Sequence, residues 1–298
     1  MKKTIVAAAV AALVAAPAAF ADVSISGNIN AEIQDQDAAE GWGNSTNTDL
    51  VFKASEDLGN GMKAGMKYHV FNDDGGDAVA DTSVFVSGDF GTVTAGRMET
   101  QNMAYFHGFA AGDAAHDMTL EDTNGQQSRG NAVQYVSPSM SGLSIGVQTM
   151  IGGNTAAGTD NVDTTDLMVK YTNGPLTVAF GDTTQKQATT DAEIQNIAVA
   201  YTMGDLTLKV LNRDVDNGVV AGSGSTAGTN EMTTVSATYK MGSNTIYAGV
   251  TDSDDGQNDD WVISAAHNMS KRTSVYVAFK NDESDNNTDT LIGMKHSF

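Results

Sequence analysis

The sequence predicts an all-β protein, a transmembrane antiparallel β-barrel of about sixteen strands. Three features predict it. Short segments that alternate apolar and polar residues recur along the chain, short and long connections follow one another in turn, and aromatic residues mark one end of several segments. Strands of about ten alternating residues, joined by short turns on one side and long loops on the other, are typical of outer-membrane barrels.

The first segment, residues 23–33, sets the strand pattern. Val23, Ile25 and Ile29 fall on one face, and polar residues such as Asn28 and Glu32 fall on the other. Such alternation predicts a strand with one apolar and one wet face, and about ten residues are enough for a tilted strand to cross a bilayer. Sixteen strands are expected, over 23–33, 50–55, 62–71, 82–87, 92–97, 131–136, 143–150, 167–171, 176–182, 194–201, 206–213, 232–240, 245–252, 261–268, 273–280 and 290–298.

The connections and the aromatic residues give the barrel two different ends. Short connections rich in turn-forming residues, such as 57–61 and 88–91, alternate with longer acidic loops, over 34–47, 72–81, 151–163, 214–230 and 281–289. Aromatic residues stand where strands meet the short turns, at Tyr135, Tyr171, Tyr201, Tyr239 and Phe298. Aromatic side chains at equivalent heights predict a girdle at the membrane interface on the short-turn side.

Composition and the N-terminus indicate an exported protein. Lys2 and Lys3, an apolar run over 5–16 and Ala19-Phe20-Ala21 form a secretory signal, residues 1–21, so 22–298 is expected to fold as a single barrel domain. The net charge of −21 falls to −23 without the two lysines of the signal, which argues against nucleic acid as a partner. There is no cysteine, and no apolar stretch after the signal is long enough for a membrane helix.

The stretch 98–130 interrupts this pattern. It is too long for an ordinary connection and lacks a clean periodicity, yet it carries apolar anchors such as Phe106, Phe109 and Leu120. A barrel of about sixteen strands is too wide for side chains to fill, so an aqueous lumen remains. We therefore expect this loop to fold into the lumen, with its acids Asp113, Asp117, Glu121 and Asp122 beside the water path.

Strand order and alternation place basic residues on the wall of that lumen. Lys63 and Lys67 are expected to point inward. Arg97 shares the outer face with Val93 and Ala95, which leaves two possibilities: the strand ends at Gly96, or Gly96 forms a bulge that turns Arg97 inward. We favour the bulge.

Other motifs point to chemistry less specifically. Residues 142–146 match a nucleophile elbow, but Ser144 lies within an alternating strand, whereas the motif needs a strand, a turn and a helix. The histidines have no metal-ligand spacing. The acidic runs 72–77 and 252–256 lack the full calcium-loop spacing, which leaves open whether these loops bind divalent cations. We therefore expect no cofactor, no metal and no catalytic residues, and a channel rather than an enzyme.

Several stretches together carry a resemblance to a known family. They are the Ala-Phe-Ala end of the signal, GDFGTVTAGR at 88–97, RGNAVQYVSP at 129–138, SKRTSVY at 270–276 and GMKHSF at 293–298. The chain resembles the Gram-negative general porins, which are trimeric, sixteen-stranded outer-membrane diffusion channels, and the resemblance runs from residue 22 to the end.

The resemblance implies a function and a constriction site. The third long loop would narrow the channel, with Arg97 and Arg129 on the wall facing loop acids, although which acids face them is open. It also implies a homotrimer, contact with outer-membrane lipid and lipopolysaccharide, and recognition of the strand ending in Phe298 by the barrel assembly machinery. Small hydrophilic solutes would diffuse passively, with a weak cation preference set by the negative charge. The alternatives are a solute-specific channel and, less favoured, an outer-membrane barrel enzyme.

Overall fold

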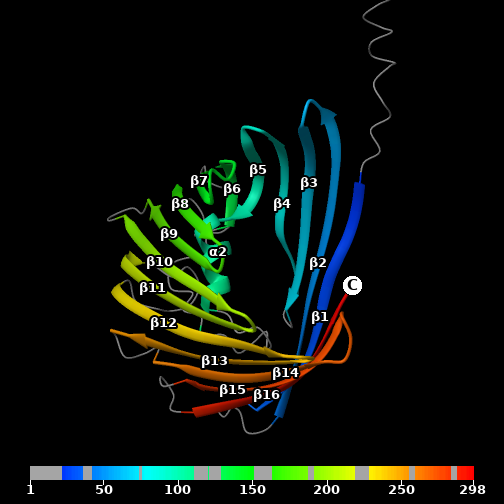
Figure 1. The fold of residues 1–298 in the computed structure, drawn as a ribbon, viewed down its shortest axis with the longest axis vertical. Helices are drawn as coiled ribbons and strands as arrows, with labels where there is room; N and C mark the ends of the chain where they lie inside the picture. The colour runs from blue at the N-terminus through cyan, green and yellow to red at the C-terminus, as the bar shows by residue number, and fades with distance from the viewer. Residues whose placement is uncertain are drawn as a thin grey trace, which may run out of the picture.

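The computed structural model shows one closed barrel with a short helix inside it (Figure 1). The structure describes residues 22–35, 42–73, 76–110, 120, 129–150, 163–186, 191–218, 228–254, 259–282 and 287–298. Each strand pairs antiparallel with the next, and β1 also pairs with β16. Closure leaves no strand edge exposed, which is required where lipid cannot satisfy backbone hydrogen bonds.

The expected sixteen strands are confirmed. They are β1 (Asp22–Asp35), β2 (Trp42–Gly59), β3 (Met62–Asp73), β4 (Gly76–Gly88), β5 (Gly91–Glu99), β6 (Arg129–Val136), β7 (Leu143–Met150), β8 (Thr164–Asn173), β9 (Leu176–Gln185), β10 (Ala192–Met203), β11 (Leu206–Gly218), β12 (Gly228–Met241), β13 (Asn244–Ser253), β14 (Trp261–Asn268), β15 (Thr273–Asp282) and β16 (Asn287–Ser297). The helix, α2 (Gln101–Ala110), lies between β5 and β6 in the sequence.

The barrel has the polarity of a membrane protein, with apolar residues outside and polar residues inside. In β1, the outward Ile25 and Ile33 are 56% and 54% exposed, whereas the inward Asn30 and Glu32 are each 2% exposed. A soluble protein would bury the isoleucines instead. An apolar outer surface facing lipid and a polar interior explain this inversion.

Most strands run further than the sequence pattern predicted, so several expected loops are shorter. The loop expected over 34–47 is largely strand, because β1 continues to Asp35 and β2 begins at Trp42. The loop expected over 72–81 is replaced by a β3–β4 hairpin that carries Asp81 within β4. Alternation fades where both faces of a strand are wet, but backbone pairing continues there because each strand still has neighbours on both sides.

The short connections and the aromatic residues lie where the sequence placed them. The turns after β8, β10 and β12 place Gly174, Gly204 and Gly242 at φ values of 56°, 60° and 61°, a region that favours glycine. The five expected girdle residues are all exposed, between 37% and 44%, on the outer surface: Tyr135, Tyr171, Tyr201, Tyr239 and Phe298.

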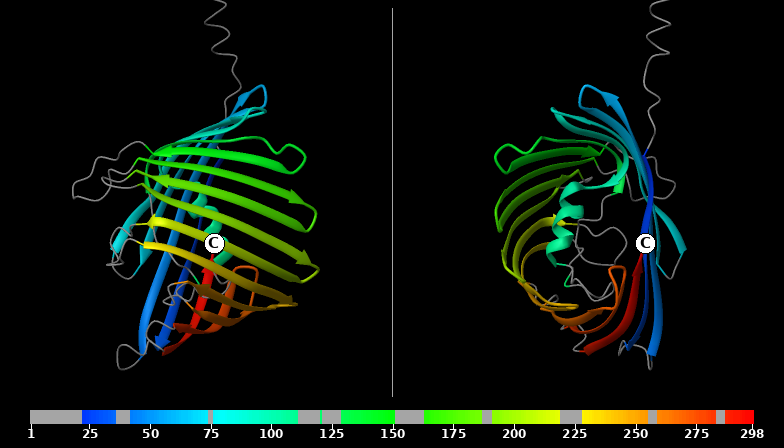
Figure 2. Two further views of the ribbon diagram at one scale, coloured as in Figure 1. Left: turned by 90° about the vertical axis from the view of Figure 1, so that its left-hand side faces the viewer. Right: turned by 45° about the vertical axis from the view of Figure 1, so that its right-hand side comes forward.

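The helix lies within the ring of strands, as the views in Figure 2 show. It contacts β8, β9, β10, β11 and β12, and further along the same loop Leu120 packs on Tyr247 of β13. The expectation that the 98–130 loop folds into the lumen is thus confirmed for its described residues. None of the helices in the described part of the chain has the length and apolarity needed to cross a membrane. The expected signal, residues 1–21, lies outside the described residues.

Candidate functional site

The site is built on α2, a helix that the sequence pattern did not predict. Thr100 precedes the helix, and its carbonyl oxygen accepts a hydrogen bond from the Ala104 amide at 3.1 Å. A ten-residue helix is marginal in water on its own, so it needs tertiary packing. Phe106 and Phe109 supply it, because they are buried against Ala179, Ala198 and Leu211 on the inner wall.

Buried polar side chains from the wall hold the N-terminal end of α2. The Gln101 amide donates to Oε1 of Gln148 at 2.9 Å, and the Asn102 amide donates to Oδ2 of Asp166 at 3.3 Å. The Asn102 side chain donates to the Leu167 carbonyl at 3.2 Å, the Asp182 carbonyl at 3.0 Å and Oγ1 of Thr183 at 2.9 Å. β7 and β8 therefore satisfy backbone donors that a helix start leaves unpaired, and β8 and β9 hold the Asn102 side chain.

Two lysines hold the other end and the lumen side of α2. Nζ of Lys209 donates to the Gly108 carbonyl at 2.7 Å and lies 6.0 Å from the centroid of the Phe109 ring. Nζ of Lys170 lies 5.5 Å from the centroid of the Tyr105 ring. Asp166 lies at the start of α2 and Lys209 at its end. Because an acid at the start of a helix and a base at its end both complement the helix dipole, the wall fixes α2 electrostatically as well as by packing. Burial raises the pKa of Tyr105, so its hydroxyl stays neutral at physiological pH.

Glycines on the inner wall make room for the loop. A Cβ on Gly181 would lie 2.4 Å from the Phe106 ring, and one on Gly146 would lie 2.1 Å from Oε1 of Gln101. A Cβ on Gly249 would lie 2.6 Å from Leu120. Glycine in a strand is typical where another part of the structure approaches closely. These glycines within alternating strands are the sequence signal that could have located the footprint of the loop.

The wall opposite α2 carries paired ionisable side chains. Nζ of Lys67 lies 2.6 Å from Oδ2 of Asp81, and Nε2 of His69 lies 2.8 Å from Oδ1 of Asp49. Arg129 forms an ion pair with Glu99. A cavity of about 360 Å³ separates this wall from α2 and is lined by Lys67, Asp81, Glu99, Gln101, Ala104 and Tyr105, among others.

The predicted wall bases do not all meet at this cavity. Lys67 lines it, and Arg129 reaches it through its partner Glu99. Lys63 lies four residues nearer the short turn, beside Asp57 and Ser87 in register, and does not line the cavity. Successive strand residues rise by about 3.3 Å, so Lys63 lies roughly 13 Å along the strand from Lys67.

Both expectations for Gly96 need correction. β5 does not end there but continues to Glu99, and β5 pairs with β4 and β6 without a register shift at Gly96. The irregularity instead falls in the β3–β4 pairing, beside Ala80. NH1 of Arg97 donates to the Ala80 carbonyl at 2.7 Å and to the Val79 carbonyl, so two carbonyl groups beside that irregularity hold the guanidinium. Gly96 takes a φ of 141°.

The remaining predicted residues add no second site. Asp113, Asp117, Glu121 and Asp122 lie outside the described residues. Ser144 lies inside β7 in register with Lys170, so no strand–turn–helix surrounds it. Among the described residues, no group of three histidine or acidic side chains is arranged to hold a metal ion.

Comparison with known proteins decides the family. Residues 7–287 match the family described as Gram-negative porin. The chain belongs to this family. Among its relatives, the major outer membrane protein P.IB of Neisseria meningitidis serogroup B is 27% identical, with all of both chains covered. Outer membrane porin protein 32 of Delftia acidovorans is also 27% identical, over 93% of this chain and 88% of its own.

Solved porins share the fold. OmpF of Salmonella typhi, in complex with daunomycin, has a TM-score of 0.79 at 13% identity, covering 93% of this chain and 97% of its own. The anion-selective porin of Comamonas acidovorans has a TM-score of 0.70 at 21% identity, covering 94% and 100%. Family membership and these relatives show that the protein is an outer-membrane porin, a water-filled channel for passive diffusion of small hydrophilic solutes and ions. In this porin a cavity lies between α2 and the wall formed by β3–β6.

Proposed function

We propose that this porin is a weakly cation-preferring pore whose constriction lies between α2 and the β3–β6 wall. The observation that carries the proposal is charge compensation on that wall. Lys67 is paired with Asp81 and Arg129 with Glu99, so these bases add little net positive field. The ion preference is then set by the net charge of the chain, which is −23 without the signal.

The proposal assigns Asp113, Asp117, Glu121 and Asp122 to the loop side of the constriction. Its support is that α2 and Leu120 carry the same loop from β5 across the lumen to β13. Acids on this loop, opposed by Lys67 and Arg129, would set a field across the water path and hinder apolar solutes. Arg97 would add its positive charge from the β3–β4 irregularity, where the Val79 and Ala80 carbonyls hold its guanidinium. Lys63 would act nearer the short-turn mouth.

The test is the reversal potential of the reconstituted channel under a potassium chloride gradient. We expect a modest displacement of the potential toward the cation equilibrium value, because a screening length of about 8 Å limits the influence of distant loop acids. A clear anion preference would overturn the proposal. An anion-selective pore is the second candidate function, because the Comamonas acidovorans porin of the same fold is anion-selective.

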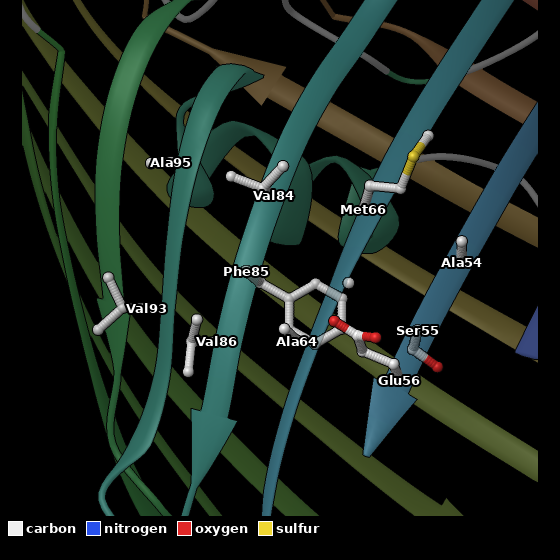
Figure 3. Close-up of a pocket in the computed structure, with 11 residues that line it drawn as sticks. Ala54, Ser55, Glu56, Ala64, Met66, Val84, Phe85, Val86, Val93 and Ala95 are labelled. Carbon is white, nitrogen blue, oxygen red and sulfur yellow. The ribbon is translucent and has the colours of Figure 1, made fainter. Parts of the chain in front are cut away.

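We also propose that the porin assembles as a homotrimer through the outer face of β2–β5. A groove of about 490 Å³ crosses this face, lined by apolar side chains including Ala54, Met66, Val84, Val86, Val93 and Ala95 (Figure 3). Val84 is 60% exposed there. Mass measurement in mild detergent tests the assembly, and Val84→Arg should yield a monomer. A parent that runs as a monomer would count against it.

Family membership also supports contacts at the membrane. The apolar outer surface fits outer-membrane lipid and the acyl chains of lipopolysaccharide. We propose that the barrel assembly machinery binds the last strand through Phe298, which is 43% exposed and whose backbone exchanges hydrogen bonds with Gly27. Deletion of Phe298 should reduce the amount of assembled barrel in the outer membrane. Unchanged assembly would exclude this role. We propose no catalytic activity.

A further inference from the structure

A second polar cavity lies on the inner wall at the short-turn end of the barrel. Its volume is about 380 Å³, and its lining includes Lys240, Thr245, Asn268, Ser274 and Lys295. The register of β12 to β16 places all five on the inner face. Lys240 lies opposite Thr245, and Ser274 lies between Asn268 and Lys295. We call this cavity the basal niche.

We propose that the basal niche binds polyvalent oxyanions, such as diphosphates or phosphorylated organic solutes, at the short-turn mouth of the channel. Lys240 and Lys295 stand on strands at either side of the niche, and the neutral groups of Thr245, Asn268 and Ser274 lie between them. An ammonium group is a strong donor to phosphate oxygens. Hydroxyl and amide groups supply further donors without adding charge.

The charged groups nearest the basal niche leave Lys240 and Lys295 available to bind an anion. In the described part of the chain, neither lysine has an ion-pair partner within 4.0 Å. The Asp205 backbone carbonyl accepts a hydrogen bond from the Lys240 amide, which places that turn beside the niche. Glu32, further up the inner wall, is buried and accepts a hydrogen bond from the Tyr276 hydroxyl at 2.5 Å. His267 is engaged with Asn244 on the other face of the sheet.

The acidity of the whole chain does not exclude an anion at this position. Its acidic loops follow the opposite strand ends, and Lys240 is twelve residues along β12 from its start at Gly228. Twelve residues of strand span roughly 40 Å. Exposed charges at that separation are screened, because the screening length is about 8 Å at physiological salt. The two mouths of the pore can therefore differ in the solutes that they concentrate.

The test uses detergent-solubilised full-length porin and inorganic pyrophosphate as the probe, with binding measured by ³¹P line broadening at low salt. We expect saturable binding that weakens by about tenfold in Lys240→Gln/Lys295→Gln, since each of the two solvated lysines contributes up to about fivefold. The matched control is Lys271→Gln/Arg272→Gln, which removes the same charge from the exposed β14–β15 turn, outside the niche. It should leave the affinity within about twofold of the parent.

Three results would overturn the proposal. They are the absence of saturable binding by the parent, equal binding by the niche variant, and an equal loss of affinity in the turn control, which would indicate a general field and not a site. Thermal unfolding of each variant confirms that the barrel is intact. A cation or anion preference in the reversal potential leaves this test unaffected, so the two proposals fail separately.

Discussion

Replacing Gly181 by alanine should push α2 into the channel. The added Cβ would lie 2.4 Å from Cε2 of Phe106 and 2.7 Å from Oδ1 of Asn102, whereas ordinary contact begins near 3.4 Å. The helix must therefore retreat by about 1 Å. Phe106 is fully buried against the wall, so the only open direction is toward the lumen. Overpacking of this kind costs about 1–3 kcal/mol.

Single-channel conductance in planar bilayers and thermal unfolding measure the two consequences. We expect lower conductance together with a lower unfolding temperature. The control is Gly108→Ala on α2 itself, where a Cβ meets nothing within 4 Å. Alanine there should favour the helix by up to about 1 kcal/mol and leave conductance close to the parent value. If Gly181→Ala destabilises the barrel yet keeps the parent conductance, α2 does not border the narrow part of the pore.

Three further predictions concern the same loop. Asn102→Ala removes three side-chain hydrogen bonds and should increase current noise and cost about 1–3 kcal/mol of stability, measured by single-channel recording and thermal unfolding. Replacing Asp113, Asp117, Glu121 and Asp122 by Asn or Gln should shift the reversal potential toward anions. It should leave the unfolding temperature nearly unchanged, because exposed pairs contribute only about 0–1 kcal/mol. Arg97→Gln/Arg129→Gln should shift the potential toward cations, partly because Glu99 then loses its partner. A parent-like potential in both charge variants would contradict the assignment of this loop as the constriction.

Local pattern was enough to predict the barrel. Alternation in segments such as 23–33 specifies which face meets lipid, and loop length separates the two ends. The ends of the strands were less predictable, because strand residues beyond the membrane are polar on both faces and yet still pair with the neighbouring strands. Asp81 illustrates the consequence. Assigned to a loop, it could not be recognised as the inner-wall partner of Lys67.

The constriction was only partly predictable, because its supports are distant in sequence. The apolar anchors Phe106 and Leu120 predicted an inserted loop. The helix α2, however, depends on hydrogen bonds from its first amides to Gln148 and Asp166, which lie 47 and 64 residues away in the sequence. No local pattern reveals such partners. Glycines at inward strand positions, such as Gly181, are the one local signal from which the contact of the loop with the wall could have been predicted.

The central claim is that α2 and the β3–β6 wall enclose the narrow part of the water path. Because the chain has no cysteine, Ala104→Cys provides a single reactive site on the lumen side of α2, in the cavity that Lys67 also lines. The decisive measurement is single-channel conductance before and after complete modification with a charged methanethiosulfonate reagent. Met140→Cys, in the turn between β6 and β7, serves as the control. The account predicts a large fall in conductance at position 104 and little change at position 140. Parent-like conductance after complete modification at position 104 would contradict it.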